Sequence, residues 1–550
     1  MTAAQLFVQC LEQEGVRYIF GIPGEETLDL LDAIRSSSIT FVVTRDEQAA
    51  AFMAATVGRL TGKIGVALTT LGPGATNLTT GVAYAQLGGM PLLVVTGQKP
   101  IRKSKQGRFQ IIDTVRMMEP ITKFSATIVS GDRIPSLVYE AVRVAEAERP
   151  GAVHLELPED VAAEETTAEV IPAKKVRRPG PDPQAIGTAV AELEKAQKPI
   201  ILIAAGANRK LVRKHLRSFI QKTGIPFVTT QMGKGVEDES SELYLGTAAL
   251  SSGDYMHVAL SRADLVMVIG HDITEKPPIV LTGEHCKVLH LNFYPAVIDD
   301  VYIPTCEVVG DISHSLWAIT EAIQVQGHWD FAPFLQLRAA EVEDCVEKIN
   351  DDSFPVKPQR LVHDLRAAVP KNGILSLDNG MYKIWIARNY TAHEQSSVLL
   401  DNALATMGAG LPGGIAAKLL YPDRPVVVVT GDGGFMTRVA ELETAKRLNL
   451  DLVILIINDS GYGMIRWKQE EMQLKDFGLS FANPDFVKLA ESFGAIGTRV
   501  ERASDLKPAI ERAIEQGGIQ IIDCPIDYSE NMKAFGQTLR NKTAHFSPPA

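Results

Sequence analysis

Two glycine-rich loops, each following an apolar run, are the feature of this sequence that most constrains its fold. Gly431-Asp432-Gly433-Gly434-Phe435 follows the apolar run 425–430, and residues 458–463 follow a second run, 452–457. Between them, residues 437–448 carry apolar side chains at helical spacing and basic side chains near the end. Continuous apolar runs are typical of strands buried on both faces. This order predicts a β-α-β unit in a parallel sheet.

The two loops bring carboxylates and glycines to one edge of that sheet. Because parallel strands end at the same edge, where open α/β sheets bind ligands, we expect Asp432 and Asp459 to lie close together. Gly433 and Gly434 let the backbone approach a phosphate. Oxygen ligands beside a phosphate suit Mg²⁺. A GDGG turn alone more often marks a capped helix start, and only the second loop favours a metal and phosphate site.

Composition and charge exclude several classes of protein. The net charge of −11 gives no basic footprint for nucleic acid. The five cysteines are scattered without a CxxC pair, which is typical of reduced thiols rather than a zinc site or a disulfide framework. The N-terminus lacks a basic and apolar leader, and no apolar run is long enough to span a membrane. We therefore expect a cytoplasmic protein with no nucleic acid and no membrane partner.

Strands alternate with helices along most of the chain, which predicts an α/β fold of three doubly wound parallel-sheet domains. Expected strands lie at 18–20, 40–44, 65–70, 91–96, 152–157, 199–204, 226–230, 265–269, 287–292 and 373–378, besides the two runs above. The predicted order is a first domain (1–165), a linker (166–184), a central domain (185–325), a charged helical connector (326–358) and a third domain with a polar tail (359–550). For the tail, closure over a site and disorder are both open.

The central domain is predicted to be Rossmann-like. Its loops 205–207 and 270–272 are placed to hold a nucleotide, but they lack the GxGxxG spacing. A packing domain without ligand is therefore the favoured interpretation.

Several motifs together resemble the thiamine diphosphate enzymes of the pyruvate decarboxylase and acetohydroxyacid synthase family. In that family a GDG is followed some two dozen residues later by an Asn-Asn pair, which here is Asn458-Asp459. The other matching segments are 20–24, the segment around Glu47, 72–77, 97–98, 149–151, 157–158 and 407–408. The resemblance implies pyrimidine-binding, central Rossmann-like and diphosphate-binding domains, with thiamine diphosphate and Mg²⁺ as cofactors.

The resemblance also implies roles for single residues. Glu47 would be the catalytic carboxylate on the pyrimidine N1′, although a Glu in the first turn of a helix is otherwise a dipole partner. Met407 would wedge the cofactor into a bent shape, although it could equally be a core methionine. The implied cofactor-binding residues are Asn379, Gly380, Ala405, Met407, Gly433, Gly434, Phe435, Tyr462 and Met464, and the implied Mg²⁺ ligands are Asp432, Asp459 and the carbonyl of Gly461.

A finer resemblance to the catabolic acetolactate synthases rests on the segments 57–63, 113–115, 120–124, 384–388 and 490–495. It implies that pyruvate is decarboxylated to a thiamine-bound hydroxyethyl carbanion, which adds to a second pyruvate to give 2-acetolactate. Gln110 is placed like the polar residue that faces substrate. Residues 269–275 follow the catabolic pattern, so FAD is not expected. In one departure, Glu25-Glu26 stand where catabolic synthases carry a small residue and a basic one.

Two alternatives remain open at this stage. A thiamine-dependent decarboxylase or carboligase for another 2-oxo acid would share every cofactor residue. A noncatalytic nucleotide- or cofactor-binding paralogue belongs to another class, although the presence of Glu47, Met407 and Asp432 argues against it. The family places its cofactor between two chains, which implies a homodimer or homotetramer.

Overall fold

Three parallel sheets organise the protein. The computed structural model describes residues 1–102, 107–174, 176–209, 211–248, 250–251, 253–275, 281 and 286–546. Its chain forms two compact units, one of Met1–Val176, Ala403–Pro422 and Thr437–Leu450, the other of Arg177–Asn402, Asp423–Met436 and Asp451–Ala550. Three six-stranded sheets are interleaved with helices, which confirms the predicted α/β class with parallel sheets. The predicted domain boundaries themselves stay a prediction.

The first unit holds one sheet of strand order β2-β1-β3-β4-β6-β5. Its strands are β1 (Tyr18–Gly21), β2 (Thr40–Val43), β3 (Gly65–Thr69), β4 (Leu92–Gln98), β5 (Phe124–Thr127) and β6 (Ala152–Pro158). Five of these were predicted within a few residues, and β5 was not. The helices before the linker are α1 (Ala3–Gln13), α2 (Leu28–Arg35), α3 (Glu47–Thr61), α4 (Pro73–Asn77), α5 (Thr79–Leu87), α6 (Thr114–Met118), α7 (Ile134–Glu146) and α8 (Glu159–Ala162).

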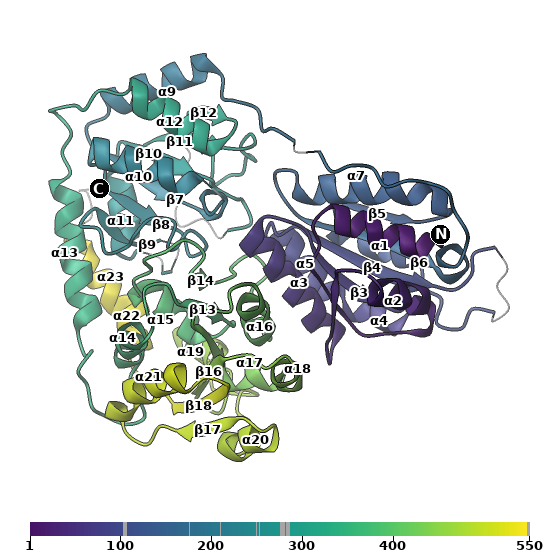
Figure 1. Ribbon diagram of the computed structural model, residues 1–550. Coiled ribbons are helices and arrows are strands. Elements are labelled where there is room, and N and C mark those ends of the chain that lie inside the picture. Colours follow the sequence, from purple (N-terminus) through teal and green to yellow (C-terminus); the bar gives the residue numbers. More distant parts are fainter. Residues whose placement is uncertain are drawn as a thin grey trace. The chain divides into compact units, whose positions relative to one another are not determined.

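Helices cover both faces of this sheet. On one face α1 and α7 share an apolar core with alternate residues of β3, β4 and β6. On the other face the alanine-rich α3 packs on β3 and against α5, as Figure 1 shows. Two later helices, α16 (Gly410–Leu420) and α18 (Glu441–Arg447), also belong to this unit, and α16 packs on α3. Glu441 accepts a hydrogen bond from the Arg45 amide at 3.0 Å, which anchors α18 beside the start of α3.

The second unit contains the central sheet, of order β12-β11-β10-β7-β8-β9. Its elements are α9 (Pro183–Lys195), β7 (Pro199–Ile203), α10 (Val212–Thr223), β8 (Phe227–Thr229), β9 (Tyr244–Thr247), α11 (Tyr255–Arg262), β10 (Leu265–Ile269), β11 (Lys287–Asn292), β12 (Cys306–Val309) and α12 (Ile312–Ala322). The bounds of β10 and β11 agree with the prediction, and the edge strands β9 and β12 were not predicted.

The same unit contains the third sheet, of order β14-β13-β15-β16-β18-β17. Its strands are β13 (Ile374–Leu377), β14 (Val398–Leu399), β15 (Val426–Gly431), β16 (Leu452–Asn458), β17 (Ile496–Arg499) and β18 (Ile519–Pro525). The remaining helices of the unit are α13 (Ala332–Val346), α14 (Pro358–Ala368), α15 (Met381–Asn389), α17 (Asp432–Met436), α19 (Gly463–Glu471), α20 (Phe486–Ser492), α21 (Leu506–Gln516), α22 (Asn531–Phe535) and α23 (Gln537–Ala544).

The predicted β-α-β unit is present with two corrections. Strands β15 and β16 pair in parallel, with Gly431 opposite Ile457, so both loops leave the same sheet edge. The GDGG segment is not an open turn, because Asp432–Met436 forms the short helix α17. The helix expected over 437–448 begins only at Glu441, after a turn. Thr437 and Val439 are β-branched, which lowers helix propensity, and the N-cap residue Ala440 makes no side-chain hydrogen bond to the helix start.

Within the described residues, which end at 546, the C-terminal tail forms the helices α22 and α23. Phe535 at the end of α22 packs edge-on against Trp385 of α15, with ring centroids 4.8 Å apart. Leu539 of α23 belongs to an apolar core with residues of α11 and β10. Disorder, one of the two possibilities left open for this tail, is therefore wrong for the residues of α22 and α23.

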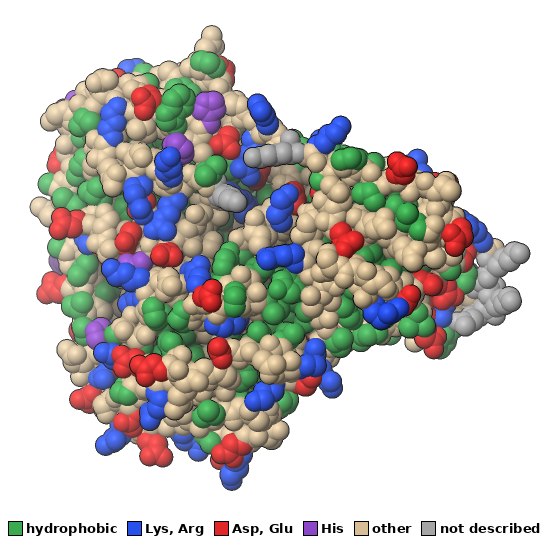
Figure 2. Space-filling model, viewed as in Figure 1, with side chains coloured by type: hydrophobic (Ala, Val, Ile, Leu, Met, Phe, Trp, Pro, Cys, Tyr) green, Lys and Arg blue, Asp and Glu red, His purple; other side chains and the backbone are tan. Residues whose placement is uncertain are grey.

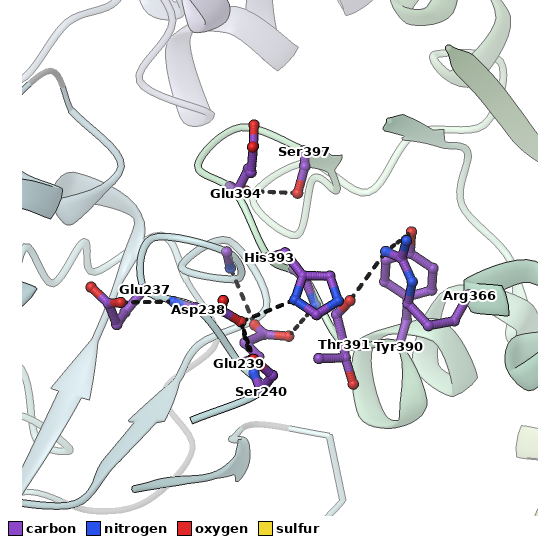
Figure 3. A network of polar contacts seen from close by, with 12 residues as sticks. Glu237, Asp238, Glu239, Ser240, Arg366, Tyr390, Thr391, His393, Glu394 and Ser397 are labelled. Carbon is purple, nitrogen blue, oxygen red and sulfur yellow. Dashed lines mark hydrogen bonds and ion pairs between the residues drawn. The ribbon is translucent and has the colours of Figure 1, made fainter. Parts of the chain in front are cut away.

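A buried ion pair connects the central-sheet region to the chain before β14. Lys234 Nζ lies 2.7 Å from Glu239 Oε2, and the two side chains are 1% and 0% exposed. Glu239 also accepts a hydrogen bond from the Ala392 amide at 2.8 Å. Next to it, His393 Nδ1 lies 3.0 Å from Asp238 Oδ1, as Figure 3 shows. Burial alone would lower the pKa of Lys234, but the Glu239 carboxylate raises it above the ordinary value.

Replacing Lys234 by Met should destabilise this unit strongly. The substitution leaves the Glu239 carboxylate buried without its cation, which costs about 3–5 kcal/mol in other proteins. Urea unfolding followed by circular dichroism measures the loss. The matched control is Lys507→Met, because Lys507 and Glu511 form an exposed pair whose loss costs about 1 kcal/mol or less. Equal effects of the two substitutions would contradict the prediction.

Candidate functional site

Asp432 is the most constrained carboxylate at the edge of the third sheet. It begins α17 directly after β15, and its side chain is buried. Its Oδ1 accepts a hydrogen bond from the Gly433 amide, and its Oδ2 accepts one from the Ser460 amide, both at 2.8 Å. Ser460 follows β16, so the carboxylate of one loop holds the backbone of the other. The predicted meeting of the two loops is therefore present.

Asn483 is a partner of this carboxylate that sequence reasoning missed. Its Nδ2 donates to Asp432 Oδ2 at 2.7 Å and to Asn458 Oδ1 at 3.1 Å. Burial raises the pKa of Asp432, although these hydrogen bonds oppose the rise. The residue precedes α20 in a loop with no motif around it, so its role follows only from the folded chain.

Asp459 lies in the same electrostatic environment. Burial, followed by the nearby Asp432 carboxylate, raises the pKa of Asp459 to about 7. Arg466 Nη1 lies 3.1 Å from Asp459 Oδ2 and opposes this rise. Two neighbouring carboxylates whose pKa values are raised by burial are the donor type that Mg²⁺ prefers. No cluster of three or more His, Cys, Asp or Glu side chains suited to a metal occurs within the described ranges, so any further ligands would be backbone, amide, cofactor or water oxygens.

A glycine cradle lies beside these carboxylates. A Cβ on Gly433 would lie 3.0 Å from the Tyr462 ring, and one on Gly434 would lie 2.9 Å from Asp378 Oδ2. Neither position has room for a larger residue without displacing a neighbour. Asp378 directly follows β13, is buried, and accepts a hydrogen bond from Thr430 Oγ1 at 3.2 Å. The segments that follow β13, β15 and β16 therefore meet at one edge of the sheet.

Helix α15, which follows β13 after a short loop, brings a buried lysine to this edge. Lys383 in α15 donates to Asn379 Oδ1 at 2.6 Å and to the Asp401 carbonyl at 3.1 Å. Burial lowers the pKa of Lys383 to about 8, although nearby acids oppose the shift. Asn379 and Gly380 were predicted to hold a diphosphate, and this cation beside them was not recognised because Lys383 lies within a helix of mostly apolar residues.

The other predicted residues of this unit occupy the same loops. Phe435 is buried and packs edge-on against Phe486, with centroids 5.8 Å apart. Tyr462 is partly exposed and packs against Phe481 at 5.1 Å. Gly461 pairs with Ser480 through an isolated antiparallel bridge. Met464 is partly buried against the core of the third sheet.

Glu47 lies at the carboxyl end of the first sheet. It is the first residue of α3, after the N-cap Asp46, whose side chain accepts a hydrogen bond from the Ala49 amide. Asn77 Nδ2 donates to Glu47 Oε2 at 3.0 Å. A Cβ on Gly74 would lie 3.4 Å from Glu47 Oε1. Asn77 is therefore a direct partner of Glu47, which the motif 72–77 contained without revealing its role.

Gln110 lies against the same turn as Glu47. It is exposed and has a left-handed backbone with φ of 58°, which is uncommon for a residue other than glycine. A Cβ on Gly72 would lie 2.8 Å from the Gln110 carbonyl oxygen, so the two segments approach closely. The turn between β3 and α4 therefore contacts both predicted catalytic residues.

Ala405 and Met407 lie in the segment that precedes α16. Ala405 has φ of 52° and Met407 is 39% exposed. An exposed methionine in a loop with left-handed backbone does not fit the alternative of a core residue. Left-handed backbone at a residue with a side chain is often found at ligand sites.

The corresponding edge of the central sheet is occupied by a carboxyl group. Glu275 is buried, and its Oε1 accepts a hydrogen bond from the Ala205 amide at 2.8 Å. Burial raises the pKa of Glu275 to about 8. The Gly206 amide donates to the Gly270 carbonyl at 2.8 Å. The amides of the loop after β7 are thus already bonded within the protein.

Comparison with known proteins covers nearly all of the chain. Residues 1–117, 186–319 and 378–524 match the N-terminal TPP binding, central and C-terminal TPP binding domains of thiamine pyrophosphate enzymes. An acetolactate synthase of Bacillus subtilis is 35% identical, over 98% of this chain and 97% of the relative. The chain belongs to the acetolactate synthase family of thiamine pyrophosphate enzymes.

Other members of the acetolactate synthase family show the same coverage. A catabolic acetolactate synthase of Raoultella terrigena is 33% identical over 97% of this chain and 96% of the relative. A probable acetolactate synthase large subunit of Methanococcus aeolicus is 32% identical over 96% of this chain and 92% of the relative. The family resemblance inferred from motifs is therefore confirmed, and the chain is a thiamine diphosphate-dependent enzyme.

Proposed function

We propose that the protein is an acetolactate synthase that condenses two molecules of pyruvate into 2-acetolactate and CO₂. The observation that carries the proposal is the edge of the third sheet. There the Asp432 carboxylate, the Asp459 carboxylate and the Gly433-Gly434 cradle come together on loops whose register is fixed by buried strands. Full-length similarity to acetolactate synthases supports the reaction class.

In this proposal the third domain holds Mg²⁺ and the diphosphate. Asp432, Asp459 and the Gly461 carbonyl would ligate the metal, whose charge offsets the burial that raises the pKa of both carboxylates and the repulsion from Asp432 that adds to the rise at Asp459. Asn379, Gly380, Gly433, Gly434 and Phe435 would surround the diphosphate, and the Lys383 cation beside Asn379 adds a favourable charge. Tyr462 and Met464 would line the adjoining pocket.

The catalytic role falls to Glu47. Thiamine diphosphate, when bound, supplies the carbanion chemistry that pyruvate decarboxylation needs. Glu47 would hold a proton at the pyrimidine N1′, and Asn77 fixes the orientation of its carboxylate. Ala405 and Met407 would contact the pyrimidine, with Met407 enforcing the bent shape of the cofactor. Gln110 would face the second substrate.

The remaining parts of the proposal concern flavin, partners and location. We propose that no FAD binds, because Glu275 already occupies the Ala205 amide at the edge of the central sheet. Acidic and basic side chains are interspersed on the face shown in Figure 2, which fits the absence of a nucleic-acid partner. No helix in the described part of the chain is long and apolar enough to cross a membrane. We also propose that the protein is a cytoplasmic homodimer or homotetramer. The boundaries of its domains are proposed to lie near residues 165, 185, 325 and 359.

A decarboxylase or carboligase for another 2-oxo acid is the second candidate function. The exposed Glu25 favours it, because an acid near an anionic second substrate is unfavourable. This candidate shares the whole cofactor site and differs only in the 2-oxo acid that it accepts and in the fate of the decarboxylated product.

Incubation with thiamine diphosphate, Mg²⁺ and pyruvate should yield acetolactate. Product analysis against acetaldehyde separates the candidates, since a decarboxylase releases the aldehyde. Acetaldehyde alone would overturn the synthase proposal, and no turnover of pyruvate would point to another oxo acid. Removing Mg²⁺ with a chelator should abolish turnover, and adding Mg²⁺ back should restore it.

Glu47→Gln should retain the fold and cofactor binding but lose most turnover. The amide keeps the size of the side chain but cannot stabilise a proton at N1′, so kcat should fall by about 10²–10⁴-fold. Steady-state kinetics and calorimetric titration of thiamine diphosphate measure the two effects. The matched control is Glu146→Gln, whose partner Lys63 is exposed. Wild-type turnover by Glu47→Gln would remove this residue from the mechanism.

The purified protein should show no flavin absorbance near the visible maxima of FAD. Added FAD should also leave the melting temperature unchanged, because the Ala205 amide is not free to bind a phosphate. Glu275→Gln is the informative comparison, since it removes the ionisable group but keeps the shape and the acceptor oxygen, so added FAD should still leave the melting temperature unchanged. A yellow wild-type protein would contradict this part of the proposal.

A further inference from the structure

A buried ion pair at the edge of the first sheet has no part in the cofactor site described above. Lys99 Nζ lies 2.5 Å from Glu26 Oε1, and the two side chains are 3% and 4% exposed. Glu26 belongs to a short 3-10 turn, Glu25–Thr27, and Lys99 follows β4. Glu25 is 86% exposed and lies 4.0 Å from the same Lys99. The two acids that the sequence placed near a substrate therefore have different environments.

Both members of the pair are held in their charged forms. Burial raises the pKa of Glu26, but hydrogen bonds from Lys99 and Thr70 outweigh burial and leave it below the ordinary value. The hydrogen bond to Glu26 raises the pKa of Lys99. A buried ion pair is weak evidence for stability, because well-packed apolar residues often serve as well or better. The location of the pair is therefore more informative than its strength.

Thr70 connects the pair to the turn between β3 and α4. Its hydroxyl donates a hydrogen bond to Glu26 Oε2. Its Cγ2 would lie 3.0 Å from a Cβ on Gly74, and the same Cβ would lie 3.4 Å from Glu47 Oε1. Lys99, Glu26 and Thr70 are therefore in direct contact, and Thr70 and Glu47 both lie close to Gly74, all within the first unit.

The same turn carries the direct partner of Glu47. Asn77 ends α4, the helix that starts at Pro73, and donates to Glu47 Oε2 at 3.0 Å. A displacement of Thr70 would shift the start of α4 and both contacts to the Glu47 carboxylate. Displacements of about 1 Å at a reacting group can cost as much as 10²-fold in rate.

We propose that Glu26 and Lys99 are positioning residues for the catalytic carboxylate: the ion pair fixes Thr70 and, through the 70–77 turn, the orientation of Glu47. The inference rests on the proposed role of Glu47. It does not require acetolactate as product, because it concerns only the carboxylate. Lys99 takes no part in binding the substrate, since its ammonium is buried and bonded to Glu26.

The test compares Lys99→Met, Glu26→Gln, the double variant and Thr70→Val with wild type. Exchange of the thiazolium C2 proton with D₂O, measured by quenched-flow NMR in the loaded enzyme without substrate, reports how well Glu47 functions. Amide hydrogen exchange of residues 70–78 in the cofactor-free protein reports the order of the turn. Steady-state kcat and KM for pyruvate and the melting temperature complete the set.

Each single substitution at the pair should slow C2 proton exchange by about tenfold or more and speed amide exchange in 70–78. The double variant should recover to within about threefold of wild type, because the amide oxygen introduced by Glu26→Gln can still accept from Thr70 and no unpaired charge remains. Thr70→Val removes the hydrogen bond to Glu26 but keeps the Glu26–Lys99 ion pair. It should therefore slow C2 exchange without lowering the melting temperature. Lys63→Met, in an exposed pair with Glu146, is the control and should change nothing.

Three results would overturn the inference. The first is lower stability of the single variants with C2 exchange within about twofold of wild type, which is a purely structural role. The second is a rise in KM with unchanged kcat for Lys99→Met, which makes Lys99 a substrate contact. The third is a double variant as slow as the slower single variant. Rapid C2 exchange in a wild type that forms no acetolactate would refute the proposed function alone.

Discussion

The buried carboxylate of Asp432 is the interaction on which the geometry of the third-sheet site depends. It holds the amides of its own helix start and of the loop after the next strand. This arrangement requires β15 and β16 to end in one register, with Gly431 opposite Ile457. The register cannot slip, because the strands are buried on both faces and a shift by one residue would exchange those faces. Apolar burial therefore sets the position of the polar site.

The same burial supports the proposal that the site binds a cation. Asp459 shares the environment of Asp432, and its proton affinity rises because water cannot stabilise its charge. The Arg466 guanidinium, 3.1 Å from Asp459 Oδ2, offsets part of this cost. Asn483 offsets part of the corresponding cost at Asp432 by donating a hydrogen bond to its Oδ2. An Asp in place of the family's Asn adds negative charge where a divalent metal is proposed, and that charge costs least when the metal is bound.

The sequence predicted the parts of the fold that rest on local patterns. Continuous apolar runs identified strands such as β10 and β11 to the residue. The two-residue strand β14 and the exposed edge strand β17 carry no such run, so they become strands only through pairing with a neighbour. β18 carries a buried run, Ile519–Pro525, which the same criterion could have found. The short helix α17 was not predicted, because its glycines have poor helix propensity and Asp432 is held by tertiary hydrogen bonds.

The residues of the candidate site fall into the same two groups, those that belong to a local sequence pattern and those that do not. Residues within a motif, such as Gly433, Gly434 and Glu47, were found because their spacing reflects a local backbone shape. Lys383, Asn483 and Lys99 were not, because each contacts a partner from another part of the chain, which for Lys383 is the Asp401 carbonyl. The pair of acids at 25 and 26 is the clearest case. One acid is exposed and the other is neutralised by a lysine after a different strand, and no local pattern distinguishes them.

These two kinds of residue also differ in how readily they can change. The edge proposed to hold the diphosphate is fixed by backbone groups on strands of one register, so few single substitutions can move it. The Glu47 end is held by side chains, through Asn77 and through Thr70 to Glu26. Side-chain contacts are lost with one substitution, whereas backbone contacts survive it. A chain of this family can therefore keep the backbone groups proposed to hold its cofactor and metal while the side chains around Glu47 change.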